Sequence, residues 1–135
     1  MSMQGIEMIR QYFKASSDMN WEAAGKCIGP GYVWIDHATG VEARTPADLK
    51  KAMEDASSYS KARYDIEASF EATDGAVIIQ GTQTCTIAGQ WRSMDVPGKE
   101  VTFPFCSIFR FDDDGLIVHE EQYYDMHSVR QQLGY

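Results

Sequence analysis

The sequence predicts an α+β protein in which N-terminal helices pack on a curled antiparallel sheet. Apolar residues recur at helical spacing in the first part of the chain, and after Ser60 they alternate with polar residues at a period of two. Short turns rich in Asp and Gly then divide the second part into consecutive strands. Helices that cover one face of a strongly bent sheet leave a hollow between the layers, which predicts a small-molecule site.

Three helices and one strand are predicted before Ser60. A short second helix begins near Asn20 and ends at residues 29–31, where Gly-Pro-Gly precedes a strand over residues 32–36. Residues 40–45 are expected to form a loop, and Pro46 suits the first turn of a third helix. The first helix is predicted from one apolar face, which comprises Ile6, Met8, Ile9, Tyr12 and Phe13.

Four antiparallel strands and a terminal helix are predicted after Ser60. Alternation from Tyr64 to Phe70 gives the first strand, and Asp74-Gly75 makes a hairpin turn. A terminal helix begins at Met126. No repeat or linker divides the chain, so residues 1–135 are expected to form one domain. The other three strands are predicted over residues 77–87, 101–111 and 116–124.

Composition limits the expected partners. The net charge of −8 predicts repulsion from phosphate backbones and anionic lipids, so neither nucleic acid nor membrane is an expected partner. Three cysteines without CxxC spacing predict buried thiols, and three histidines without ligand spacing predict no metal site and no cofactor. The start lacks a signal sequence and no apolar stretch is long enough to span a membrane, so a cytoplasmic protein is expected.

Asp36 is the first candidate for a functional residue. It follows the apolar run of residues 32–35 and should end a buried strand. Burial of a carboxylate raises its pKa, which makes the group a competent general base. Asp125, at the end of the last strand, is the second candidate. Either carboxylate could instead cap the segment that follows it, because Asp is a favoured helix N-cap.

Side chains around Asp36 complete the first candidate site. Tyr12 is either a core residue or a hydroxyl donor for a developing oxyanion. Tyr32 and Trp34 share a strand face with Asp36 and either line the pocket or belong to the core. His37 could act as an acid or base near pH 7, although it points the opposite way if the strand continues.

Around Asp125 the period of two places Ile117, His119, Glu121 and Tyr123 on its face of the last strand. If Asp125 faces the cavity, Tyr123 does so too. Trp91, in the loop before Pro97, is predicted either to close the mouth of the cavity or to lie in an interface.

The N-terminal half resembles the ketosteroid isomerases of the nuclear transport factor 2-like cone fold. This resemblance is carried by residues 11–13 (Gln-Tyr-Phe), 34–37 (Trp-Ile-Asp-His) and 40–44 (Gly-Val-Glu-Ala-Arg). It implies an oxyanion-binding tyrosine at Tyr12 and a general base at Asp36. It also implies a cone-shaped barrel around the ligand.

The C-terminal half resembles the SnoaL-like polyketide cyclases. The resemblance is carried by Val96-Pro97-Gly98-Lys99 with Val101 and Phe103, by Tyr123-Tyr124-Asp125, and by Gln131-Gln132-Leu133-Gly134. It implies that Asp125 is the acid/base residue. When residues 109–111 are aligned with the isomerase pattern, Ser107 stands where those enzymes have a second catalytic group, an aspartic acid.

Two functional hypotheses follow. The first is a cofactor-independent isomerase or cyclase that acts on a small hydrophobic carbonyl compound, with Asp36 or Asp125 as the base. The second is a non-catalytic domain that binds a hydrophobic ligand or mediates dimerisation. A homodimer through the outer sheet face is predicted from threonines at positions 82, 84 and 86 on a long strand. Predicted substrate contacts are Tyr32, Trp34, Trp91, Phe103, Ser107 and Tyr123.

Overall fold

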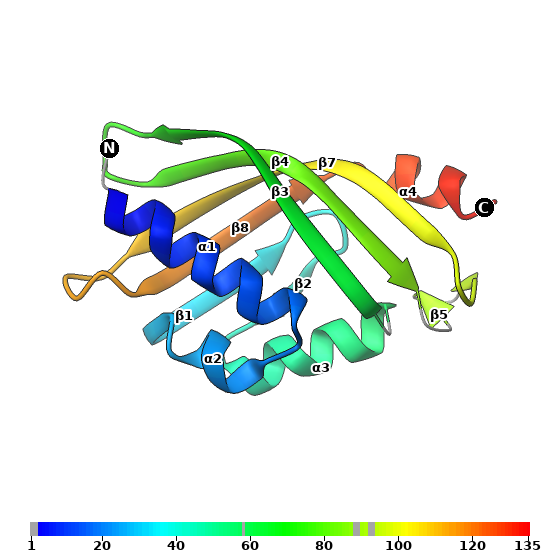
Figure 1. Cartoon of the computed structure of the whole chain (residues 1–135), viewed down its shortest axis with the longest axis horizontal. Helices are drawn as coiled ribbons and strands as arrows, with labels where there is room; N and C mark the ends of the chain where they lie inside the picture. Colours follow the sequence, from blue (N-terminus) through cyan, green and yellow to red (C-terminus); the bar gives the residue numbers. More distant parts are fainter. Residues whose placement is uncertain (1–2, 58, 88–89, 92–93) are drawn as a thin grey trace.

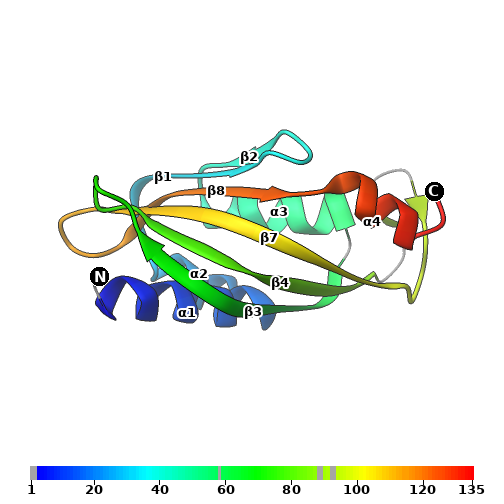
Figure 2. The same ribbon diagram turned by 90° about the horizontal axis from the view of Figure 1, so that it is seen from above.

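Three helices lie along one side of a sheet (Figures 1 and 2). The computed structural model describes residues 3–57, 59–87, 90–91 and 94–135. The helices are α1 (Met3–Ser17), α2 (Trp21–Gly25) and α3 (Pro46–Ser57). The predicted α+β arrangement, with N-terminal helices packed on a sheet, is therefore confirmed.

Six strands form the main sheet, in the order β2-β1-β8-β7-β4-β3. One strand pair differs from the antiparallel arrangement expected, because β1 runs parallel to β8. No hairpin joins these two strands, so local turn geometry does not fix their relative direction, and the sheet is mixed. The strands are β1 (Ile28–Asp36), β2 (Val41–Ala43), β3 (Tyr59–Glu71), β4 (Val77–Ile87), β7 (Glu100–Phe111) and β8 (Ile117–Tyr124).

Four smaller elements complete the described structure. The segment expected to be a loop after Gly40 contains β2, which pairs antiparallel with β1. A ribbon of β5 (Gln90–Trp91) and β6 (Met94–Asp95) precedes β7. The predicted terminal helix is α4 (Met126–Gln132), which lies at the opposite end of the molecule from the start of α1 (Figure 1).

Side chains of α1 and the inner sheet face build most of the apolar core. Phe13 of α1 stacks on Tyr64 of β3, with ring centroids 4.5 Å apart, and meets Phe105 and Phe109 of β7 edge-on. A second buried cluster contains Phe103, Val101 and residues of α4. Tyr64 and Tyr124 pack against both clusters.

A bulge interrupts the predicted alternation along β3. The register against β4 shifts between Ile66 and Ala68, so the residues that follow change face. Phe70, expected to continue the apolar face of Tyr64, is instead 52% exposed on the outer face. The alternation of residues 82–87 on β4 is regular, with the three threonines half-buried and the intervening residues buried.

Two of the three thiols are buried as expected. Cys27 and Cys85 are buried, Cys106 is half-buried, and none of the three forms a disulfide. In the described ranges, no helix combines the length and hydropathy that a bilayer crossing requires.

Candidate functional site

Five buried polar side chains share the inner face of the sheet: Asp36, Gln83, Ser107, Glu120 and Gln122. We call this group the inner polar cluster. The strand register places it there, because Asp36 is paired with Gln122, and Gln122 with Ser107. Gln122 also donates a hydrogen bond from Nε2 to Oε1 of Gln83, at 2.8 Å. Polar groups buried in this way must find partners inside the protein or in a ligand.

Asp36 occupies the end of β1 and is only 6% exposed. Its Oδ1 accepts hydrogen bonds from the amides of Ala38, at 2.9 Å, and Thr39, at 3.3 Å, so it caps the turn that leads to β2. Its Oδ2 accepts a bond of 2.8 Å from the hydroxyl of Tyr124. Burial raises the pKa of Asp36, and these hydrogen bonds oppose the rise. The candidate base is therefore buried and fixed in orientation.

Glu120 of β8 is the second buried carboxyl group of the cluster and is 3% exposed. Its register partners are Trp34 on β1 and Phe109 on β7. The Ser107 hydroxyl donates to its Oε2 at 3.4 Å. Burial, with a smaller contribution from the Asp36 charge, raises the pKa of Glu120 to about 8, and the hydrogen bonds of Tyr12 and Ser107 oppose the rise. A carboxyl group in this environment holds its proton at neutral pH.

Two tyrosine hydroxyls lie next to Glu120. Those of Tyr12 on α1 and Tyr32 on β1 are hydrogen-bonded at 2.7 Å, and both residues are buried. Burial raises the pKa of each well above the ordinary tyrosine value, so both are neutral hydroxyl groups. The structure thus brings the predicted residues Tyr12, Tyr32 and Asp36 to one face.

The remaining inner-face predictions also lie near this cluster. Trp34 is buried two residues before Asp36 on the same strand, and Ser107 donates a hydrogen bond to Glu120. Phe103 is buried with its ring centroid 4.8 Å from that of Tyr124, the residue that bonds Asp36.

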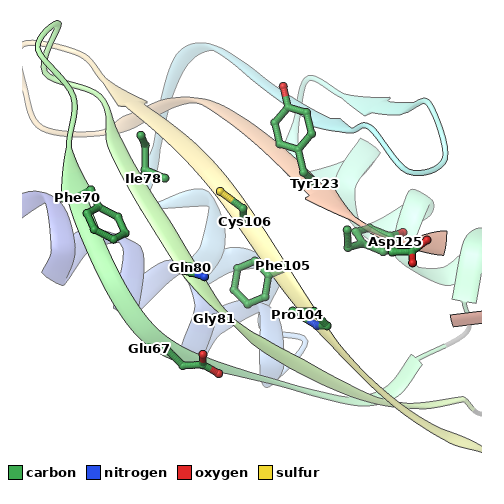
Figure 3. A pocket seen from close by; sticks show the side chains of 11 residues that line it. Glu67, Phe70, Ile78, Gln80, Gly81, Pro104, Phe105, Cys106, Tyr123 and Asp125 are labelled. Atoms are coloured by element: carbon green, nitrogen blue, oxygen red, sulfur yellow. The ribbon is translucent and has the colours of Figure 1, made fainter. Parts of the chain in front are cut away.

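Asp125 and Tyr123 lie on the outer face, where they line a surface pocket of about 490 Å³ with Phe70 and Cys106 (Figure 3). The predicted sharing of one face by Tyr123 and Asp125 is thus observed, but this face is opposite the helices. Asp125 is exposed, and its Oδ1 accepts a 2.9 Å bond from the amide of His127 as the N-cap of α4.

His37 also lies outside the inner polar cluster. Its ring stacks on Tyr123 with centroids 4.3 Å apart, and its Nε2 is 2.9 Å from Oε1 of Glu121. His119 contacts the other oxygen of Glu121 at 3.1 Å, and the two imidazoles lower the pKa of that carboxylate. These side chains form an outer histidine pair, separated from Asp36 by the sheet.

Two other expectations concern Trp91 and metals. Trp91 lies in β5, and its side chain is outside the described part of the structure. Among the residues that are described, no three His, Cys, Asp or Glu side chains are placed to hold a metal ion.

Sequence reasoning missed Glu120, Gln122 and Tyr124. The cause is the run His119 to Tyr124, in which every residue is polar or a tyrosine, so no apolar alternation indicates which residues face inward. The prediction took the phase of Asp125, whereas the inner phase is that of residues 120, 122 and 124. The sequence does place Glu120 and Gln122 two residues apart, so that they share one face of a strand. Their proximity to Asp36 follows only from the pairing of β1 with β8.

The helices, the mixed sheet and the inner carboxyl groups define an α+β protein of the nuclear transport factor 2-like fold. The SnoaL-like domain family matches residues 9–120, which is most of the chain, so the protein belongs to this family. A search of curated proteins found no match.

Solved structures of low sequence identity share the fold. A candidate SnoaL-like polyketide cyclase from Shewanella putrefaciens is 15% identical with a TM-score of 0.80, covering 99% of this chain and 98% of that one. A hypothetical protein of ketosteroid isomerase-like fold from Catenulispora acidiphila, in complex with trimethylamine, is 22% identical with a TM-score of 0.76, covering 95% and 92%. TerC, co-crystallised with polyporic acid, is 16% identical with a TM-score of 0.74, covering 98% and 99%.

Proposed function

We propose that this protein is a cofactor-independent acid/base enzyme of the isomerase or cyclase type, acting on a small hydrophobic carbonyl compound held against the inner sheet face. Asp36 is the general base. The observation that carries this proposal is its combination of burial, a raised pKa and orientation by Tyr124. Asp125 is not assigned this role, because it is exposed and caps α4.

The chemistry requires a base beside a carbon acid and a donor at the carbonyl oxygen. Asp36 removes a proton from the carbon next to the carbonyl, and the negative charge moves to the oxygen as an enolate. A neutral tyrosine hydroxyl such as that of Tyr12 stabilises this charge by donating a hydrogen bond. An isomerase returns the proton to another carbon, whereas in a cyclase the enolate carbon attacks a second carbonyl carbon.

Relatives of the same fold support a small organic ligand. One was crystallised with trimethylamine and another with polyporic acid. At 22% and 16% identity they share the fold, so the choice of a carbonyl substrate rests on the chemistry of Asp36 and its neighbours.

The test is deuterium exchange into 2-tetralone, a small apolar ketone, followed by proton NMR in heavy water. The protein should accelerate exchange at the carbons next to the carbonyl, and Asp36→Asn should reduce the acceleration by about 100-fold or more. Asp125→Asn is the matched control, since asparagine is an equally good N-cap. Wild-type exchange rates in Asp36→Asn, or no acceleration by the wild-type protein with 2-tetralone, would contradict the proposal.

The outer face favours a second function, association of two copies. Phe70 and Tyr123 are 52% and 42% exposed beside the outer pocket, which is unusual for large apolar side chains on a sheet. We propose a homodimer through this face. Light scattering should give about twice the 15.2 kDa chain mass, and Phe70→Glu should give the monomer. A monomeric wild-type protein at all concentrations would refute it.

A further inference from the structure

Glu120 is a buried titratable group that the mechanism above does not use. Its Oε2 receives the Ser107 hydroxyl, whereas Oε1 is buried with no hydrogen-bond partner among the described residues. Buried oxygens of this kind are rare, because water has been removed and nothing replaces it. Oε1 is therefore the carboxyl oxygen of the inner polar cluster for which the described residues supply no hydrogen-bond partner.

No buried cation accompanies this carboxyl group. Within the described ranges, the charged residues that are buried are Asp36 and Glu120, and no buried Lys, Arg or His stands beside them. A structural buried carboxylate normally has a cationic partner or a full set of donors. Glu120 has neither, and its neighbours are hydroxyls and the second carboxyl group. This surrounding favours an uncharged carboxylic acid, which is a hydrogen-bond donor.

The strand register sets the spacing of the two carboxyl groups. Trp34 pairs with Glu120 and Asp36 with Gln122 on the parallel strands β1 and β8. Asp36 is thus one strand across and two residues along from Glu120, on the same face. With a rise of about 3.3 Å per residue and strands about 4.8 Å apart, their backbone positions are roughly 8 Å apart. Side chains converging from that separation can contact neighbouring atoms of one small molecule.

We propose that Glu120 is the second catalytic residue of this site, donating a hydrogen bond from its carboxylic acid to the carbonyl oxygen of the substrate while Asp36 deprotonates the adjacent carbon. This inference rests on the function proposed above. The C–H proton moves to Asp36, the C–H electron pair becomes the carbon–carbon π bond, and the carbonyl π pair moves to the oxygen that Glu120 binds. The proton of Glu120 stays on Glu120 or is shared with that oxygen, and Asp36 returns its proton to carbon.

The same arrangement defines the substrate class at this position. The buried carboxylate of Asp36, with no buried cation beside it in the described ranges, repels a carboxylate or phosphate group, so the part of the substrate next to Glu120 carries a neutral carbonyl oxygen. Tyr12, which contributes a hydrogen bond to Glu120, orients the acid.

The test measures exchange into 2-tetralone for Glu120→Gln and Glu120→Leu, with Asp36→Asn beside them and Glu121→Gln as the matched control on the outer face. Glu120→Leu removes the donor and should reduce kcat by about 100-fold, as expected for one oxyanion donor, without lowering Tm. Glu120→Gln keeps a weaker donor and should retain an intermediate rate. In infrared spectra at pH 7, the wild-type protein and Glu121→Gln should show a protonated carboxyl band that Glu120→Gln lacks.

The outcomes separate the two proposals. If Asp36→Asn abolishes exchange and both Glu120 variants keep the wild-type rate, the inference fails while the proposed function stands. If Asp36→Asn exchanges protons at the wild-type rate, the proposed function itself is wrong. A Glu120→Leu variant whose Tm and rate fall together indicates a structural role and also overturns the inference. The infrared measurement does not depend on the activity of any variant. If the wild-type spectrum at pH 7 lacks the protonated carboxyl band assigned to Glu120, Glu120 is not a carboxylic acid donor and the inference fails.

Discussion

Asp36 ends β1 and Asp125 directly follows the neighbouring strand β8, and each caps the backbone two residues further on, through Oδ1 at 2.9 Å. The two residues share this bond. The difference lies in the second oxygen and in the face: Asp36 is buried and accepts from Tyr124, whereas Asp125 is exposed beside the outer pocket. Capping alone therefore carries no information about function, and the face of the sheet decides which carboxyl group is buried.

The two faces also differ in how their charges are paired. On the outer face, Glu121 contacts two histidines, and exposed pairs such as Arg110 with Asp74 are common. On the inner face, the described partners of Glu120 and Asp36 are hydroxyls, amides and each other. Two buried carboxyl groups lower the stability of the fold, so the inner polar cluster is a stability cost that the function proposed above would explain.

The largest expected effect is on the pH dependence of stability and comes from Glu120. Its pKa is about 8 in the folded protein against 4.5 ordinarily. Between these values the unfolded chain has released the proton and the folded protein keeps it, so stability falls as pH rises. At 1.36 kcal/mol per pKa unit, the loss from pH 4.5 to 8 is about 5 kcal/mol.

Glu120→Gln should lack this loss. Urea unfolding of both proteins at pH 5 and pH 8 checks it, with Glu121→Gln as the control from the outer face. Because the pKa of Glu121 is lowered, its contribution is present above its unfolded pKa and is lost only as pH falls through the lower folded value, outside this window. Parallel pH profiles for the wild-type protein and Glu120→Gln would show that Glu120 is ionised and would weaken the contrast between the faces.

A smaller effect is expected from Tyr124→Phe, which removes the hydrogen bond to Oδ2 of Asp36. Bonds to charged groups contribute about 1.5 to 3 kcal/mol, so a loss near 2 kcal/mol is expected above the pKa of Asp36. The Tyr124 bond lowers the pKa of Asp36, so its removal should raise that pKa further. A carbon-detected NMR titration of the Asp36 carboxyl group measures this pKa shift. An unchanged pKa in Tyr124→Phe would show that the Tyr124 hydroxyl does not bond Asp36 in solution.

The sequence predicted the helices, most strands and Asp36 because each has a local signal. The apolar run before Asp36 indicates a buried strand, and Asn20 accepts from the amide of Ala23 at the start of α2, as its type predicts. These features depend on a few adjacent residues. Tyr12 was found through resemblance to a family rather than through its helical spacing, which equally fits a core residue.

The features that sequence could not predict depend on distant strands. The parallel pairing of β1 with β8 joins residues 86 to 89 positions apart in the sequence, and it places Glu120 beside Trp34 and near Asp36. The bulge after Ile66 shifts Phe70 to the outer face without any change in the residue pattern. Register is weakly encoded where both faces of a strand carry polar residues, as in the second half of β8.

The smallest expected effect comes from Asp125→Ala. This change removes the N-cap of α4 but no member of the inner polar cluster, so it should cost about 1 kcal/mol and leave exchange into 2-tetralone unchanged. Asp125→Asn, which can still cap, should restore the stability measured by urea unfolding. The loss of stability should come from weaker packing of Val129 of α4 and of its C-cap Leu133, which both belong to the second apolar cluster. If Asp125→Ala instead abolished exchange while α4 stayed folded, the assignment of the chemistry to the inner face would be wrong. Asp125, which is exposed on the outer face, would then be the acid/base residue, as the resemblance to the cyclases implies.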